Sequence, residues 1–170
     1  MALTKLNFGG SQTALLAGDL PTLAASNMPT GSVIQTVSAI TTTGSGAVTT
    51  TTAILSGSIT PTSTSSKIYI TAHGSCSVIC GSSGILNSHI HRGGISDTAI
   101  TRFYSGLGAG VTSGHEHYIN VDHAVLDSPS TTSSQTYTLS IAKGSGGTTS
   151  VKFIGTAGHP MVMTLMEIAG

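Results

Sequence analysis

The stretch 54–72, ILSGSITPTSTSSKIYITA, carries the alternation that decides the fold. Ile59, and later Ile68 and Ile70, alternate with polar or small neighbours, which is the period of a half-buried strand. The link 61–66 contains only Pro, Ser and Thr, so its proline lacks a ladder N–H and its hydroxyls offer local hydrogen bonds instead. We therefore expect two strands joined by an exposed turn, either a β-hairpin or a corner of a sandwich, with the three isoleucines buried against a facing sheet.

The same pattern of short alternating runs separated by Gly/Ser turns continues along the chain. Strands at near-regular spacing without amphipathic helices between them are typical of an antiparallel β-sandwich or jelly roll. No fixed-length repeat is present, which disfavours a solenoid. The predicted fold class is therefore all-β, with nine strands over residues 32–40, 51–60, 67–80, 84–91, 95–104, 117–126, 136–143, 149–155 and 161–168.

The composition is poor in charge. Only 7% of the 170 residues are charged, against roughly 25% in an ordinary soluble domain. Six basic residues balance six acidic ones, so the chain has no basic footprint for nucleic acid or for an anionic membrane. The 38% of apolar residues, placed at strand spacing, argues against disorder of the whole chain. Low charge removes repulsion between copies, so we expect the protein to work in an assembly.

Two further features bear on the compartment. No basic-then-apolar leader opens the sequence and no apolar run approaches the roughly 18 residues of a membrane helix, so synthesis and assembly in a cytoplasm are expected. Cys76 and Cys80 lie on one predicted strand, which places their Cα atoms about 13 Å apart, too far for a disulfide. They are expected to be buried free thiols.

Residues 1–30 differ from the rest and are interpreted as an N-terminal arm preceding a knob of residues 31–170. Glycines and prolines interrupt this stretch, leaving room for a short helix over residues 13–17 at most. It cannot form its own core, yet it is too apolar for a solvated tail, so its apolar side chains are expected to contact a partner. An ordinary frayed terminus is the alternative. The predicted contact residues are Leu3, Leu6, Phe8, Leu15, Leu16, Leu20 and Leu23.

The last predicted strand, MVMTLMEI over residues 161–168, is apolar on both faces apart from Thr164 and Glu167. A strand of this kind is either central in its sheet or an edge that a subunit covers.

Histidines are the chemically most suggestive residues. His89 and His91 form one His-x-His pair and His115 and His117 a second, each with imidazoles roughly 6.6 Å apart on one strand face, close enough to share a metal. Histidines that hydrogen-bond to backbone carbonyls are the favoured interpretation. No metal or other cofactor is therefore predicted.

Catalytic signatures are missing from the sequence. It has no nucleophile elbow, no phosphate-binding Gly-x-x-x-x-Gly-Lys-Ser/Thr loop, and no aromatic platform beside its few carboxylates. We predict that the protein is not an enzyme. Its tyrosines and phenylalanines are interpreted as packing residues, and Asp97, Arg102 and Asp122 as candidates for ion pairs between chains.

Four segments resemble a known class of proteins: MALTKLNFGGSQTALLAGDLPT, GSVIQTVSA, SGSITPTSTSSKIYITA and the closing MTLMEIAG. They are similar to the β-rich modules of tailed-bacteriophage structural proteins, especially in phages of marine bacteria and cyanobacteria, which occur in tail fibres and head decoration proteins. The resemblance implies a virion component, assembled in the bacterial host cytoplasm and usually a homotrimer with β-sandwich or jelly-roll knobs.

The short arm and single knob favour a capsid decoration, or cement, protein whose arm binds the major capsid protein. The alternative is a tail fibre or receptor-binding tip, which would contact tail proteins and a host surface receptor. In that case loops 41–50, 106–114 and 128–134 would recognise the host. Neither role involves nucleic acid or membrane binding.

Overall fold

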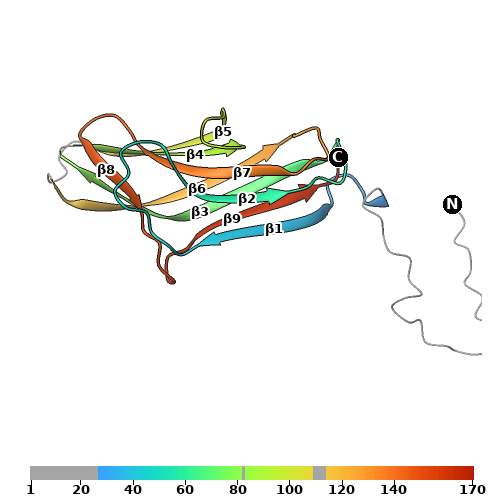
Figure 1. The fold of residues 1–170 in the computed structure, drawn as a ribbon, viewed down its shortest axis with the longest axis horizontal. Helices are drawn as coiled ribbons and strands as arrows, with labels where there is room; N and C mark the ends of the chain where they lie inside the picture. Colours follow the sequence, from blue (N-terminus) through green and yellow to red (C-terminus); the bar gives the residue numbers. More distant parts are fainter. Residues whose placement is uncertain (1–26, 82, 109–113) are drawn as a thin grey trace, which may run out of the picture.

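A computed structural model describes residues 27–81, 83–108 and 114–170. These residues form nine antiparallel strands in two facing sheets (Figure 1). Among the described residues there is no helix long and apolar enough to cross a membrane. The strands are β1 (Val33–Thr41), β2 (Thr52–Ile59), β3 (Lys67–Cys80), β4 (Gly84–Arg92), β5 (Ala99–Leu107), β6 (Glu116–Asp127), β7 (Gln135–Lys143), β8 (Thr148–Phe153) and β9 (Met161–Ile168).

The strand order is that of a jelly roll. The first sheet runs β1-β9-β3-β6, with β8 also paired to β3, and the second sheet runs β2-β7-β4-β5. Early strands therefore pair with late ones: β1 pairs with β9, β2 with β7 and β3 with β6. β4 and β5, which lie in the middle of the strand sequence, pair with each other. This is the pairing of a long hairpin rolled into two layers. The predicted all-β antiparallel sandwich is confirmed.

The stretch that decides the fold forms a corner of the sandwich. β2 belongs to the second sheet and β3 to the first, so residues 60–66 cross between the layers and do not close a hairpin. Ile59, Ile68 and Ile70 are buried in the core between the sheets, as predicted. The expected exposed turn is exposed only in its middle, because the corner buries both of its ends, Pro61 and Ser66.

The predicted strand 95–104 begins too early. The structure starts β5 at Ala99 because residues 93–97 form a tight turn. Asp97 Oδ2 accepts a hydrogen bond from the Gly94 amide at 2.7 Å, and Gly93 adopts a φ of 97°, which favours glycine. The side chain of Asp97 therefore stops the ladder that the alternation of apolar residues predicts.

β3 is the longest strand, with 14 residues, and pairs on both sides. β6 accompanies it on one side, while β9 pairs with its first half and β8 with its second half on the other side. Gly74 lies between these two partners, where a Cβ atom would meet Met161 Sδ at 2.6 Å. A glycine at this position allows Met161 to fill the core.

Both cysteines lie on β3, buried and unpaired, as predicted. Burial raises the pKa of the Cys76 thiol to about 12. This thiol is therefore protonated at neutral pH and unreactive.

A polar network joins the two sheets at one end of the core. Asp127 on β6 accepts hydrogen bonds from Tyr137 Oη at 2.7 Å and from Arg92 Nε at 2.8 Å, and Arg92 Nη2 completes the ion pair. Burial favours the neutral carboxyl, but the hydrogen bonds from Arg92 and Tyr137 outweigh it and lower the pKa of Asp127. The network connects the first sheet to β4 and β7 of the second.

We predict that Asp127→Asn lowers the free energy of unfolding by about 2 kcal/mol, because the charged hydrogen bonds from Arg92 and Tyr137 are lost. The half-exposed Arg92 keeps the loss below that of a fully buried pair. Because folding depresses the pKa of Asp127, its contribution is present above pH 4 and is lost as the pH falls further. Urea unfolding measures both effects.

Asp122→Asn is the matched control, since Asp122 is exposed on the same strand. Equal midpoints for the two variants would contradict the structural role of the network.

Candidate interaction surfaces

The predicted arm contacts, Leu3 to Leu23, lie outside the described residues. The described chain starts at residue 27 and meets the sandwich beside its C-terminus (Figure 1). There the Gly31 amide donates to the Ala169 carbonyl at 2.8 Å, and the Ala169 amide donates to the Ser32 carbonyl at 2.8 Å. The two ends of the knob are therefore held together at one end of the molecule.

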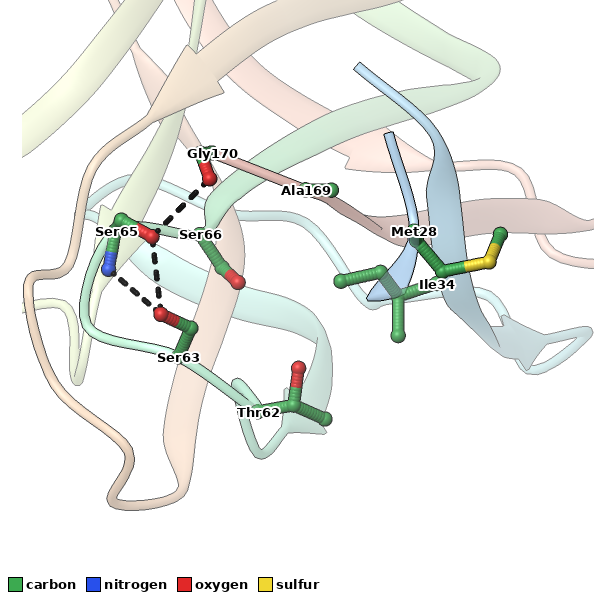
Figure 2. A pocket seen from close by; sticks show the side chains of 8 residues that line it. All are labelled: Met28, Ile34, Thr62, Ser63, Ser65, Ser66, Ala169 and Gly170. Carbon is green, nitrogen blue, oxygen red and sulfur yellow. Dashed lines mark hydrogen bonds between the residues drawn. The ribbon is translucent and has the colours of Figure 1, made fainter. Parts of the chain in front are cut away.

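A hollow opens at this end of the sandwich (Figure 2). Met28 and Ile34 lie on one side of it, and the corner residues 62–66 lie on the other, with the C-terminal residues between them. Ser65 Oγ reaches the Gly170 carbonyl at 3.3 Å, which ties the C-terminus to the corner. The hollow thus combines an apolar wall with a hydroxyl-rich wall.

Glu167 fixes the elements around this hollow. Its buried carboxylate accepts hydrogen bonds from Thr62 N at 2.7 Å, Thr62 Oγ1 at 2.7 Å and Gln35 Nε2 at 2.6 Å. Burial raises the pKa of Glu167, but the hydrogen bonds from the surrounding side chains and backbone outweigh it and lower the pKa. The polar exception in the apolar strand 161–168 therefore joins β1, β9 and the corner.

The outer face of the first sheet is rich in apolar and hydroxyl side chains. Paired residues on the four strands form rows across it, one of Thr36, Met166, Tyr69 and Leu126 and another of Ile40, Val162, His73 and Asp122. Ile40 at one side of the sheet is 61% exposed and Leu126 at the other is 52% exposed. Side chains of this size on one sheet face, with few charges among them, are typical of a surface that another protein covers.

Among the described residues, β1 is an edge strand without protection. Its sequence, VIQTVSAIT, has no charged residue and no proline, and among the described residues it pairs with β9 alone. Natural edge strands are usually protected by charges, prolines or bulges, and β1 has a single irregularity between Val33 and Gln35. β9 itself is central, between β1 and β3, which agrees with its apolar character on both faces.

The histidine pairs differ in their surroundings. His91 uses both ring nitrogens, Nδ1 with the Asp97 carbonyl at 2.8 Å and Nε2 with Ser140 Oγ at 3.0 Å. His89 contacts it edge-on, with ring centroids 5.8 Å apart. His115 is exposed, while His117 is half-buried. Within residues 27–81, 83–108 and 114–170, no group of three or more metal-ligating side chains gathers.

Aromatic and charged residues divide between core and surface. Tyr137 and Phe153 are core residues, whereas Tyr104 and Tyr118 are exposed. The Asp97 carboxylate accepts a hydrogen bond within the turn of residues 93–97. The ion pairs within the described part of the chain are Arg92–Asp127 and Lys152–Glu116. Ion pairs between chains that involve Arg102 or Asp122 stay a prediction.

His123 is buried between the sheets. Its Nε2 lies 2.9 Å from Ser88 Oγ, and its ring packs edge-on against Phe103. Burial, together with nearby His89, lowers the pKa of His123 to about 4, although Asp122 opposes the change. The imidazole is therefore neutral at physiological pH. In the sequence, the burial of His123 is signalled only by its inward position in the strand alternation.

No family model matches this chain, and no curated protein matches it. Among solved structures it is similar to a subunit of Bacillus endospore appendages, a family of disulfide-linked pili, with 16% identity, 84% of this chain and 96% of that chain covered, and a TM-score of 0.36. It is also similar to a protein of infectious bursal disease virus strain Gx, with 14% identity, 80% of this chain but 32% of that chain covered, and a TM-score of 0.38. VP2 of the subviral particle of this virus is also similar, with 13% identity, 81% of this chain and 39% of that chain covered, and a TM-score of 0.36. All these TM-scores lie below 0.5, so the function proposed below rests on the sequence resemblance and on the surface of this chain.

We predict that His123 makes the fold sensitive to acid. The unfolded chain binds a proton near pH 6.5 and the folded chain only near pH 4, so stability falls as the pH decreases through this window. The full difference corresponds to about 3 kcal/mol. Thermal unfolding from pH 7 to pH 4 should therefore show a steep loss in the wild type and a shallower one in His123→Gln.

His115→Gln removes an exposed imidazole and should keep the wild-type slope. Identical slopes in all three proteins would assign the acid sensitivity to other groups.

Proposed function

We propose that this chain is a virion structural protein of a tailed bacteriophage and that it decorates the capsid. The observation that carries the proposal is the uncharged, unprotected edge of β1 beside the apolar outer face of the first sheet. A surface of this kind is suited to assembly, because a neighbouring protein buries its apolar side chains and pairs its free backbone groups. Its function is mechanical and non-enzymatic.

Copies of the same chain are the proposed partners for this surface. An edge without charge does not repel an identical edge, and the balanced charge of the whole chain offers no long-range repulsion. The sequence resemblance implies a homotrimer, in which each knob contributes about 800 Å² to a standard-size interface. The knob comprises residues 31–170.

The arm of residues 1–30 is the proposed attachment to the shell. Its leucines and Phe8 would bury apolar area across the boundaries between major capsid subunits, which opposes the outward pressure of packaged DNA. Met28 and Ile34 form the apolar wall of the hollow at the end of the knob where the arm begins (Figure 2). A capsid subunit that contacts the arm can therefore also contact the apolar wall of the hollow on the knob.

A tail fibre or receptor-binding tip is the second candidate. A groove on the outer face of the first sheet, lined by an exposed tyrosine and polar side chains, favours this role. Both candidates place the protein in the virion after assembly in the host cytoplasm.

We predict that Ile40→Lys weakens self-association at least tenfold, because it places a charge on the β1 edge of each copy. Ile40 is 61% exposed in the single chain, so the substitution should leave the fold intact. Analytical ultracentrifugation over a range of concentrations measures the effect. Ile95→Lys is the control, since Ile95 is also an exposed isoleucine but lies outside the first sheet. A wild-type protein that stays monomeric would refute assembly through β1.

We predict that replacing Leu15, Leu16, Leu20 and Leu23 by serine abolishes binding to phage heads, because the arm loses the apolar area that it buries on the shell. The variant should keep the oligomeric state of the wild type. Co-sedimentation is measured separately with purified heads lacking this protein and with purified tails.

Replacement of Ser11, Thr13 and Ser26 by alanine is the control and should leave head binding unchanged. Binding of the leucine variant to heads would refute the role of the arm. Binding of the wild type to tails and not to heads would favour the tail-tip role.

A further inference from the structure

The first sheet has a notch on its outer face. β9 pairs with β3 as far as His73, and β8 pairs with it from Cys76 onward. Between these two partners, residues 154–160 leave the ladder, and the Ile154 amide returns a hydrogen bond to the Ser75 carbonyl at 3.1 Å. The chain thus forms a rim beside β3 where the ladder is interrupted.

Two adjoining hollows lie along this notch, with volumes of about 360 Å³ and about 400 Å³. They share Ser75 and His159 in their linings, and we call the two hollows together the notch groove. Its volume is in the range of about 300–1,000 Å³ that is usual for small-molecule sites. The side chains that the argument uses are His73, Ser75, Tyr118, Asn120, Asp122 and His159.

The register of β3 and β6 places the floor of the groove. Ser75 is paired with Asn120, and His73 is paired with Asp122. Tyr118 precedes Asn120 by two residues on β6 and therefore lies on the same face. Ser75 Oγ donates to Asn120 Oδ1 at 3.1 Å, which orients the amide so that its NH₂ group is left for a ligand. Tyr118 is 72% exposed, the largest value among the exposed apolar side chains of the described residues.

The rim of the groove is held in place. Thr156 and His159 form an isolated antiparallel bridge, in which the His159 amide donates to the Thr156 carbonyl at 3.0 Å. At the base of the rim, the Phe153 amide donates to Ser45 Oγ at 2.8 Å. Gly155 packs so closely on loop 41–50 that a Cβ atom would lie 2.2 Å from the Gly44 nitrogen. His159 is therefore presented over the groove by a braced turn.

We propose that the notch groove binds a neutral saccharide. Sugar hydroxyls donate and accept hydrogen bonds, which matches the Asp122 carboxylate, the Asn120 amide and the two imidazoles of the groove. The exposed ring of Tyr118 offers a flat apolar surface for the C–H face of a sugar ring, so the expectation that no aromatic platform stands beside a carboxylate was wrong at this position. This inference is independent of whether the virion carries the protein on its head or on its tail.

The lining disfavours other ligands. The described residues around the groove include no lysine or arginine, and Asp122 repels anions, so phosphate and sulfate groups are poorly matched. His73, Asp122 and His159 line the groove but do not converge as a metal-ligating group in the described structure.

The full-length protein tests the proposal on an array of neutral oligosaccharides built from glucose, galactose, mannose and N-acetylglucosamine, with heparin as an anionic probe. Hits are titrated by saturation-transfer NMR at millimolar concentrations. We expect at least one neutral saccharide to bind, and Tyr118→Ala and Asp122→Asn each to weaken it about tenfold or more. Tyr104→Ala, which removes a 57% exposed tyrosine from the second sheet, should bind like the wild type.

Unfolding midpoints equal to that of the wild type establish that the variants are folded. The proposal is overturned if no neutral saccharide binds, if only heparin binds, or if Tyr118→Ala binds like the wild type. It is equally overturned if Tyr104→Ala weakens binding as much as Tyr118→Ala does. The arm is unchanged in these variants, so their result is separate from that of the head-binding experiment.

Discussion

The backbone of β3 must find hydrogen-bond partners on both sides, and the rest of the structure depends on how it does so. β6 satisfies one side along most of its length, but the other side is shared by β8 and β9. The chain must leave the ladder between these two strands, which creates the rim at residues 154–160, and Gly74 beside this gap leaves room for Met161. The interruption in the ladder beside β3 is thus the origin of the notch groove on the surface.

Because the chain has few charged residues, each buried carboxylate makes a large contribution to holding the strands together. Asp127 joins β6 to β4 and β7 across the core, and Glu167 joins β9 to β1 and the corner. Both act between segments that are distant in the sequence, so they stabilise the roll as a whole. The surface left over is nearly neutral, which removes the usual electrostatic barrier to association.

The two proposed surfaces lie on the same sheet without competing for it. Ile40 and Asp122 end one row of paired residues on opposite sides of the sheet, about 14 Å apart at the usual strand spacing. Contacts at the β1 edge therefore leave the groove beside β6 open. A protein that assembles through β1 can present one groove per copy, which adds avidity to weak binding of a sugar.

The sequence by itself determined the fold class and most strand limits, including those of β3 and β9, because alternation is a local property that records which face of a strand is buried. In the predicted strand 117–126, Tyr118, Asn120 and Asp122 occupy alternating positions. Only the tertiary structure decided that 60–66 is a corner, that Asp97 delays β5, and that His73 and His159 meet the face of β6. Register and layer order depend on backbone pairing between distant segments and on the packing of the whole core, and neither leaves a periodic signal in the chain.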